Sequence, residues 1–202
     1  MWEVNNAHKV MMEALYVYAE LSVPDDVVNG KRRYYLQNKN GRKIYLIDKG
    51  DYFLKVKDSN RIVGVYSDPA VVGVTHGIDE SPLYLEKIGY GKIYDIELNF
   101  FWEMVKNHDL IDYVIDIFSE SYHQLMCFNL MNKKDTYEEI KAYIDFWREM
   151  PERIIRGHSM LSLLEQSSNL SRSTICRVLR NMRENEGLNL VNGRIRQEEE
   201  SE

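Results

Sequence analysis

The segment from residue 169 to residue 183 constrains the fold of this chain more than any other stretch, because it reads as one complete amphipathic helix. Ser171 is a natural N-cap, since its hydroxyl can accept a hydrogen bond from an unpaired amide of the first turn. Apolar residues then recur at the spacing of a buried face: Ile175, Val178, Leu179 and Met182. The opposite face is polar and basic, with no acid before Glu184: Arg172, Ser173, Arg177, Arg180 and Arg183. A helix of this kind is often only a solvated surface helix, so the neighbouring segments are needed to judge whether it has a function.

The neighbouring segments favour a DNA-binding motif. Upstream, Met160 to Glu165 reads as a shorter apolar helix, and the polar run 166–169 supplies a turn. Downstream, 188–191 and 194–196 read as strands joined by Asn192-Gly193, a strong signal for a two-residue hairpin. Two helices around a tight turn, followed by a basic hairpin, are typical of a winged helix-turn-helix. The basic patch lies in a chain of formal net charge −6, which makes it a local feature that points to nucleic acid.

The start of this helix also resembles a known family. It is similar to the recognition helix of the cyclic-AMP receptor protein/FNR (CRP/FNR) superfamily, roughly Ser-Arg-Glu-Thr-hydrophobic-small-Arg-hydrophobic-Leu, in the run Ser171-Arg172-Ser173-Thr174-Ile175-Cys176-Arg177-Val178-Leu179. The resemblance implies that Arg172, Ser173 and Arg177 read bases. Because Ser173 replaces the family's usual acid, a different half-site is expected.

The resemblance extends upstream over most of the chain. The run from Tyr137 to Ala142 resembles the start of the helix before the DNA-binding domain, and Val71 to Ile78 resembles the end of the sensor β-roll. The chain looks most like the small IprA-like branch, whose sensor domain has lost the cyclic-nucleotide signature. The implied partners are a palindromic double-stranded DNA operator and a second copy of the chain, with RNA polymerase as a further candidate. The implied DNA contacts are Ser171, Arg172, Ser173, Thr174, Arg177, Arg180, Arg183, Asn192, Arg194 and Arg196.

Composition fits a packed globular protein in a reducing cytoplasm, and the family resemblance implies a bacterial one. The chain of 202 residues is long enough for one large or two small domains, and it is 44% hydrophobic. No apolar run is long enough to span a membrane. The segment from Met1 to Leu21 has charged residues throughout, which indicates an amphipathic helix and not a secretion signal. Cys127 and Cys176 form no metal motif and no disulfide framework.

The overall fold class expected is α+β. Between residues 23 and 98, short β-prone runs alternate with turn signals, which predicts a small antiparallel sandwich or roll. The runs are 33–36, 43–47, 52–56 and 62–66, and the turns are Asn29-Gly30, Asn40-Gly41, Lys49-Gly50-Asp51 and Asp58-Ser59-Asn60.

From residue 99 the pattern becomes helical. A short helix is expected to end near Asn107-His108, and Asp109 is expected to cap a second helix that runs to about residue 132. The apolar band of that helix is too wide for simple packing on a sheet, which indicates a dimer interface as in the family, although core packing within a monomer is the alternative. The expected interface residues are Ile111, Val114, Phe118, Tyr122 and Leu125.

A third helix is expected from Asp135-Thr136 through Trp147, ended by Pro151. The expected domains are therefore a sensor-like roll with its N-terminal helix (1–98), a dimerisation helix (99–132), a winged helix-turn-helix (133–196) and an acidic tail (197–202).

The sensor domain lacks the residues that hold a cyclic nucleotide in the family. A phosphodiester requires an arginine fork, and the ribose requires a carboxylate. Val74 follows Gly73 where the family has glutamate, and no arginine occurs between Asp79 and Leu98. Control by cyclic nucleotide is therefore not expected, and neither is any cofactor. An iron–sulfur cluster needs about four thiolates, and His76 is read as structural in preference to a haem ligand.

No enzyme signature is present in the sequence. The five histidines are scattered over the chain, and no nucleophile elbow, phosphate-binding loop or dinucleotide fingerprint occurs. Cys176 is interpreted as the small residue of the recognition helix, with a redox switch as the alternative. The sequence therefore predicts a homodimeric, non-enzymatic transcription regulator. The competing hypothesis is a ligand or protein sensor with a vestigial helix-turn-helix.

Overall fold

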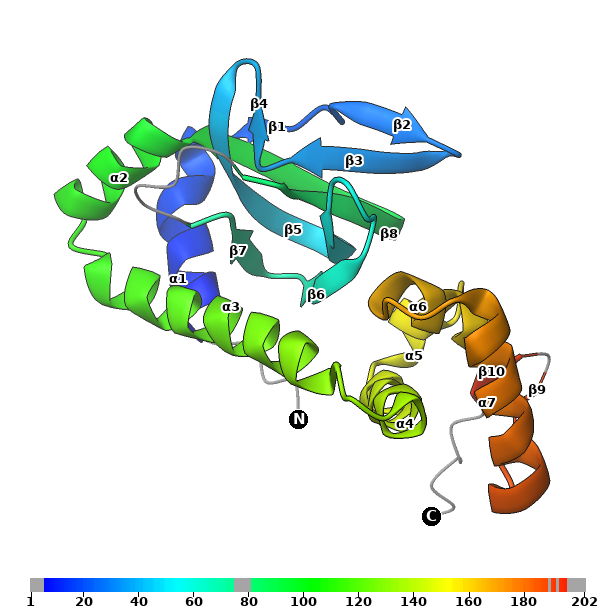
Figure 1. Cartoon of the computed structure of the whole chain (residues 1–202). Coiled ribbons are helices and arrows are strands. Elements are labelled where there is room, and N and C mark those ends of the chain that lie inside the picture. Colours follow the sequence, from blue (N-terminus) through cyan, green and yellow to red (C-terminus); the bar gives the residue numbers. More distant parts are fainter. Residues whose placement is uncertain (1–5, 75–80, 189, 192, 196–202) are drawn as a thin grey trace, which may run out of the picture. The chain divides into compact units, whose positions relative to one another are not determined.

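The chain forms two compact units, residues 1–126 and 127–202, each of which is described by itself. The computed structural model describes residues 6–74, 81–188, 190–191 and 193–195. The division falls within the long helix α3, and the domain boundaries expected from the sequence stay a prediction. In chain order the elements (Figure 1) are α1 (Asn6–Leu15), η1 (Tyr16–Tyr18), β1 (Glu20–Leu21), β2 (Asp26–Val28), β3 (Lys31–Tyr35), β4 (Gln37–Asn38), β5 (Gly41–Val56), β6 (Ile62–Ser67), β7 (Ala70–Val72), β8 (Leu83–Glu97), α2 (Leu98–Asn107), α3 (Ile111–Met131), α4 (Thr136–Arg148), α5 (Glu152–Ile155), α6 (Met160–Ser167), α7 (Arg172–Glu186), β9 (Leu190–Val191) and β10 (Arg194–Ile195).

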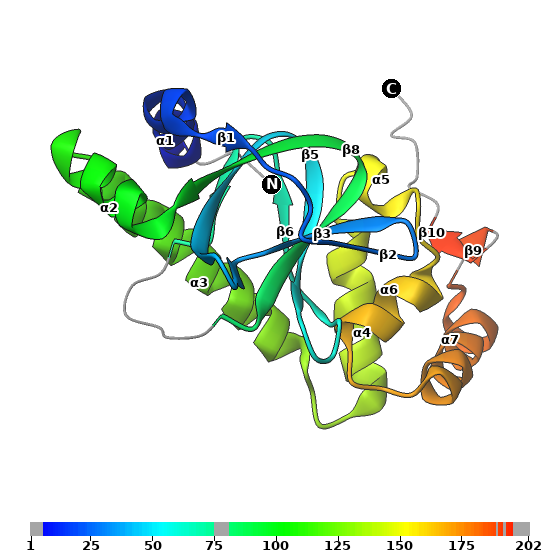
Figure 2. The same cartoon turned by 90° about the horizontal axis from the view of Figure 1, so that it is seen from above.

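The N-terminal unit is built on an antiparallel sheet in which β5 and β8 are the long central strands. They pair from Lys43↔Glu97 to Val56↔Leu83. The strand order is β2-β3-β8-β5-β4, with β1 on β8 and with β6 and β7 on β5. Figure 2 shows the long strands β5 and β8 side by side. The predicted antiparallel roll is therefore confirmed for the described part of the unit.

One expected turn is wrong, because Lys49-Gly50-Asp51 lies inside β5. The strand passes through this point with two shifts of register against β8, so the runs 43–47 and 52–56 are one bent strand. Gly50 has φ +89°, and a Cβ there would collide with the backbone of Tyr90 and Gly91. A glycine at a close backbone approach within a strand thus produces a bulge where the sequence suggests a turn.

The segment from Val71 to Ile78, which resembles the end of a sensor roll, does not end the sheet. Val71 and Val72 belong to β7, but β8 follows and supplies the longest pairing in the sheet. β8 is not among the strands predicted from the sequence, because Gly89 and Gly91 interrupt its apolar pattern. Residues 75–80, which include His76, lie outside the described residues.

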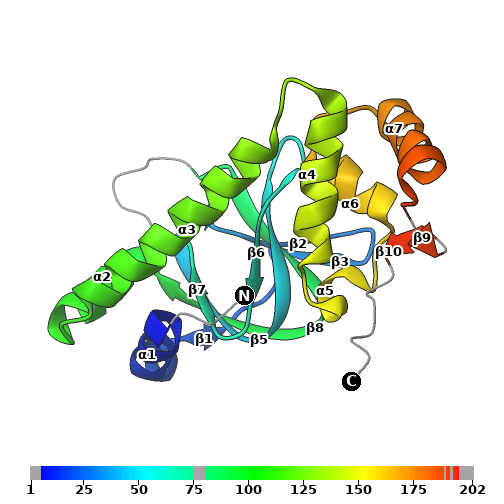
Figure 3. The ribbon, with the colours of Figure 1, turned by 90° about the horizontal axis from the view of Figure 1, so that it is seen from below.

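Both faces of β5 are buried, each in a different apolar cluster. Tyr45 and Ile47 point into the roll, whereas Ile44 and Leu46 pack against helices, as strand alternation requires. The helical cluster joins residues of α1, α2 and α3 to the sheet, and Figure 3 shows α1 and α3 beside β7. Inside the roll, burial raises the pKa of the Tyr66 phenol to about 12.

A buried histidine links three elements of this unit. His8 lies on α1, and its Nδ1 accepts a hydrogen bond of 3.0 Å from the Val71 amide of β7. Its Nε2 lies 3.3 Å from a carboxylate oxygen of Glu120 on α3. The predicted N-terminal helix is therefore present over Asn6–Leu15, and His8 ties it to both a strand and the long helix.

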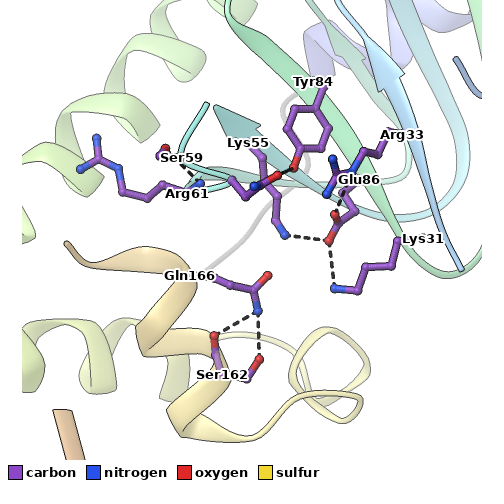
Figure 4. Close-up of polar contacts among 10 residues, drawn as sticks. Lys31, Arg33, Lys55, Ser59, Arg61, Tyr84, Glu86, Ser162 and Gln166 are labelled. Atoms are coloured by element: carbon purple, nitrogen blue, oxygen red, sulfur yellow. Dashed lines mark hydrogen bonds and ion pairs between the residues drawn. The ribbon is translucent and has the colours of Figure 1, made fainter. Parts of the chain in front are cut away.

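A buried ionic cluster joins β3, β5 and β8 (Figure 4). Glu86 accepts hydrogen bonds from Lys55 Nζ at 2.7 Å and Lys31 Nζ at 3.0 Å, and Arg33 Nε lies 3.6 Å from its other oxygen. Burial alone would raise the pKa of the Glu86 carboxyl, but the hydrogen bonds and charges of the two lysines lower it below its ordinary value. The cluster satisfies a carboxylate that could not be buried alone.

The two helices after the sheet match the expected order. α2 ends at Asn107 with His108 as its C-cap, as predicted, and α3 begins at Ile111. Asp109 is not the N-cap of α3, because it lies two residues before the helix and has φ +53°, whereas an N-cap has an extended conformation. None of the helices in the described ranges is both long enough and apolar enough to cross a membrane.

Candidate nucleic-acid interface

The expected pair of helices in the C-terminal unit is present, and each begins with a serine cap. Ser159 Oγ accepts a hydrogen bond of 3.1 Å from the Ser162 amide at the start of α6. Ser171 Oγ accepts one of 3.3 Å from the Thr174 amide at the start of α7. α6 runs two residues further than expected, to Ser167, and residues 168–171 form the tight connection to α7.

The apolar face of α7 is buried as predicted: Ile175, Val178, Leu179 and Met182 are each at most 8% exposed. α6 contributes Leu163 and Leu164 to the same unit, and the Trp147 indole of α4 donates to Ser167 Oγ at 3.2 Å. α7 ends at Glu186. Its C-cap is Gly187, which has a φ of +69° and donates its backbone N–H to Met182 O, as is typical of a helix C-cap. α7 is therefore held on one side by a packed core and at both ends by caps.

The opposite face of α7 is exposed and basic. Its exposed residues include Arg172, Ser173, Arg177, Arg180 and Arg183, and Cys176 is exposed among them. At its first turn, Ser171 Oγ lies 2.9 Å from both Ser173 Oγ and Thr174 Oγ1, which gathers three hydroxyl groups at the helix N-terminus. Amides and hydroxyls at a helix N-terminus, with arginines beside them, are suited to bind phosphate oxygens.

A short hairpin follows α7, as the Asn-Gly signal predicted. β9 and β10 pair antiparallel with Arg194 opposite Val191, and Gly193 in the turn has φ +74°. The carbonyl of Gly193 accepts a hydrogen bond of 2.8 Å from the Met160 amide, which fixes the turn at the start of α6. Arg194 belongs to β10, and the predicted contacts Asn192 and Arg196 lie outside the described residues.

An ion pair that the sequence analysis missed connects the two helices of the motif. Arg172 Nη1 donates to both carboxylate oxygens of Glu165, at 3.0 Å and 3.2 Å. Glu165 is the last residue of the short helix that the sequence predicts. A linear pattern of residues cannot show that its side chain contacts a residue seven positions later. Only the closed helix-turn-helix places the two side chains together.

The long helix α3 also has an exposed face, and unlike that of α7 it is apolar. Phe118 is 54% exposed and Tyr122 58%, although both are large hydrophobic residues. Val114, which was expected at the interface, is instead 4% exposed and belongs to the core of its own unit, while Ile115 lies on the exposed face. The exposed stripe of α3 is therefore Ile111, Ile115, Phe118, Tyr122 and Leu125.

Comparisons with known proteins agree with this architecture at the level of fold. No family model matches the sequence, and a search of curated proteins finds no match. Among solved structures, the c-di-GMP-responsive global regulator CLP of Xanthomonas campestris superposes with a TM-score of 0.63 at 14% identity, over 89% of this chain and 93% of that one. FixK2 of Bradyrhizobium japonicum superposes with a TM-score of 0.56 at 14% identity, over 80% and 87%. A Eubacterium rectale protein assigned to the crp/fnr family of transcriptional regulators gives 0.61 at 13% identity, over 94% and 88%. This chain therefore has the fold of these proteins.

Proposed function

We propose that the protein is a sequence-specific DNA-binding transcription regulator of the CRP/FNR superfamily, in its IprA-like branch, and that it acts as a homodimer. The observation that carries the proposal is the exposed face of α7, where arginines and helix-start hydroxyls lie on a capped helix between a tight turn and a hairpin. The shared fold with solved regulators supports it. The bacterial cytoplasm is the proposed location, with RNA polymerase as a further partner.

In the proposed complex, α7 lies in the major groove of DNA. An arginine can donate two hydrogen bonds to guanine O6 and N7, so Arg172 and Arg177 are the proposed base readers. Ser171, Thr174 and the first amides of α7 then bind phosphate oxygens, which sets the orientation of the helix. Arg180, Arg183 and the hairpin residues Asn192, Arg194 and Arg196 supply further phosphate contacts.

The proposed dimer forms through the exposed stripe of α3. Its residues at 111, 115, 118, 122 and 125 are spaced alternately by four and three positions, which is the heptad spacing of a helix that pairs with another helix. Burying these side chains against a second copy would remove a continuous apolar surface from water. A two-fold dimer carries two copies of α7 and is expected to read an imperfect palindrome whose half-site centres lie about one helical turn apart.

We further propose that neither cyclic AMP nor cyclic GMP controls the protein. Val74 follows Gly73, and the cations of β8 are Lys87 and Lys92, neither of which offers a guanidinium fork. Lys92 Nζ is already 3.8 Å from Asp48, and Lys87 Nζ donates to the Gly91 carbonyl at 2.5 Å. The effector, if the roll takes one, is thus of a different chemical class.

A thermal melt is a sensitive test of whether the protein binds cyclic nucleotides. A ligand that binds the folded state at about one hundred times its dissociation constant stabilises that state by about 2.7 kcal/mol. Millimolar cyclic AMP or cyclic GMP is expected to leave the melting temperature unchanged. A saturable rise in melting temperature, accompanied by tighter operator binding, would return the protein to the nucleotide-responsive branch.

The DNA-binding proposal itself is tested by gel shift on the region upstream of the protein's own gene, with excess non-specific competitor. The parent is expected to give a discrete complex, and the double variant Arg177→Ala/Arg180→Ala to lose it. Arg148→Ala is the matched control, because it removes an exposed arginine of α4 in the same unit. A parent that binds only as its competitor does, with no selectivity, would favour the sensor hypothesis instead.

A further inference from the structure

Arg172 differs from the other arginines of the recognition face because its charge is already engaged. Its Nη1 donates to Glu165 Oε1 at 3.0 Å and to Oε2 at 3.2 Å. Within the described ranges, Arg177, Arg180 and Arg183 have no hydrogen-bond or ion-pair partner. The acid therefore acts on one specific member of the basic face.

The ion pair holds Arg172 without using up its donors. A guanidinium has five N–H groups in one plane, and Glu165 engages only those of Nη1, which leaves Nη2 and Nε available. Two free donors in a fixed plane are what a bidentate contact to guanine requires. Arg172 remains 70% exposed as a side chain, so the pair does not withdraw it from the surface.

Glu165 lies on a helix whose neighbouring residues are well anchored. It lies on α6 between the buried Leu164 and the buried Ser167, and its side chain is 29% exposed. On the next residue, Gln166 Nε2 donates to Ser162 O and Oγ, each at 3.0 Å (Figure 4). The backbone of Glu165 is therefore held by α6, and its carboxylate meets the longer side chain of Arg172 from this anchored helix.

We propose that Glu165 is a positioning residue that determines specificity: it orients Arg172 for one guanine and, through its negative charge, disfavours binding to DNA that lacks this guanine. The inference rests on the proposed function, since it assigns a role within the same DNA interface. A carboxylate near the phosphate backbone opposes non-specific binding, whereas an arginine held in plane loses less freedom when it meets the correct base. Both effects increase the ratio of specific to non-specific affinity.

The test compares dissociation constants of the full-length protein for its selected duplex and for duplexes with one base pair changed, at one salt concentration. Arg172→Ala identifies the base pair that Arg172 reads. Glu165→Gln is expected to reduce discrimination at that same base pair by about fivefold, the size of effect that an exposed ion pair can exert. It should also bind unrelated DNA more tightly than the parent. In Arg172→Ala/Glu165→Gln, the loss at that base pair should not exceed the loss in Arg172→Ala alone.

Two further variants separate position from charge. Glu165→Asp keeps the charge but shortens the reach, so it is expected to lose discrimination without any gain in binding to unrelated DNA. Glu184→Gln removes one exposed acid elsewhere on α7 and is expected to leave discrimination intact. The inference is overturned if Glu165→Gln only shifts affinity for every duplex equally, as Glu184→Gln would. A parent that selects no sequence overturns the proposed function itself, and this is visible before any variant is made.

Discussion

Helices α7 and α3 are both amphipathic, and each buries one face within the chain, yet their exposed faces differ in chemical character. On α7 the exposed face carries arginines and hydroxyls, whereas on α3 it carries Phe118, Tyr122 and other large apolar residues. The buried faces are explained by packing within the chain. The exposed faces are not, and their chemistry points to different partners: a polyanion for α7 and a second protein surface for α3.

The largest loss of DNA affinity is expected when a charge is placed on the exposed apolar face of α3. Phe118→Glu would place a charge in the proposed dimer interface without a partner, which is energetically expensive. Light scattering should report a monomer or an aggregate. Operator affinity should fall by about 100-fold or more, because the two half-sites are no longer bound together.

Ser119→Glu is the control, because Ser119 is exposed on α3 but lies beside the apolar stripe. It adds the same charge and should leave a dimer that binds DNA. A well-folded dimer of Phe118→Glu would remove α3 from the interface and break the contrast between the two helices.

The next effect concerns a single base reader on α7. Arg177→Ala should weaken binding to the selected sequence by about 1–3 kcal/mol for each lost bidentate contact, and relax base preference at one position in each half-site. The dimer should be unaffected, since Arg177 lies on α7. The measurement is a set of dissociation constants for operators mutated one base pair at a time. Unchanged preference at every position would show that Arg177 does not face the bases.

Substitution of the hairpin arginine is expected to reduce DNA affinity by less, and without any change in base preference. Arg194→Ala should weaken binding to all sequences about equally and reduce the slope of log affinity against log salt by about 1.8, because the dimer loses two phosphate contacts at about 0.9 each. Titrations at several salt concentrations would measure this. A loss of affinity confined to one sequence would instead indicate that Arg194 contacts a base. It would contradict the proposal that α7 reads bases while the hairpin contacts phosphates.

How well the sequence predicted each region depends on how local the determining contacts are. The cap at Ser171, the buried stripe of α7 and the Asn-Gly hairpin depend on neighbours within a few residues, and all three are confirmed. The bend at Gly50 was misread as a turn because its cause is the backbone of Tyr90 and Gly91, forty residues away in the chain. A glycine between two β-prone runs has the same local signature in a turn and in a bulge.

Side-chain pairs between elements were the least predictable. Glu165 with Arg172, His8 with Val71 and Glu120, and Glu86 with its cations all depend on how elements close on one another. Val114 shows the same limit within one helix. A periodic pattern identifies an apolar band but cannot divide it between the core and a partner, and only the packed structure assigns Val114 to the core and Ile115 to the exposed stripe.

The central claim is that two copies of α7, held together by α3, read one symmetric DNA site. Sequencing of DNA fragments that the purified protein selects from a random pool tests this most directly, because site symmetry and base identity emerge from the same experiment. We predict an imperfect palindrome with half-site centres about one helical turn apart and a guanine in each half. A pool that enriches no motif, or only an unrepeated half-site, would contradict the account.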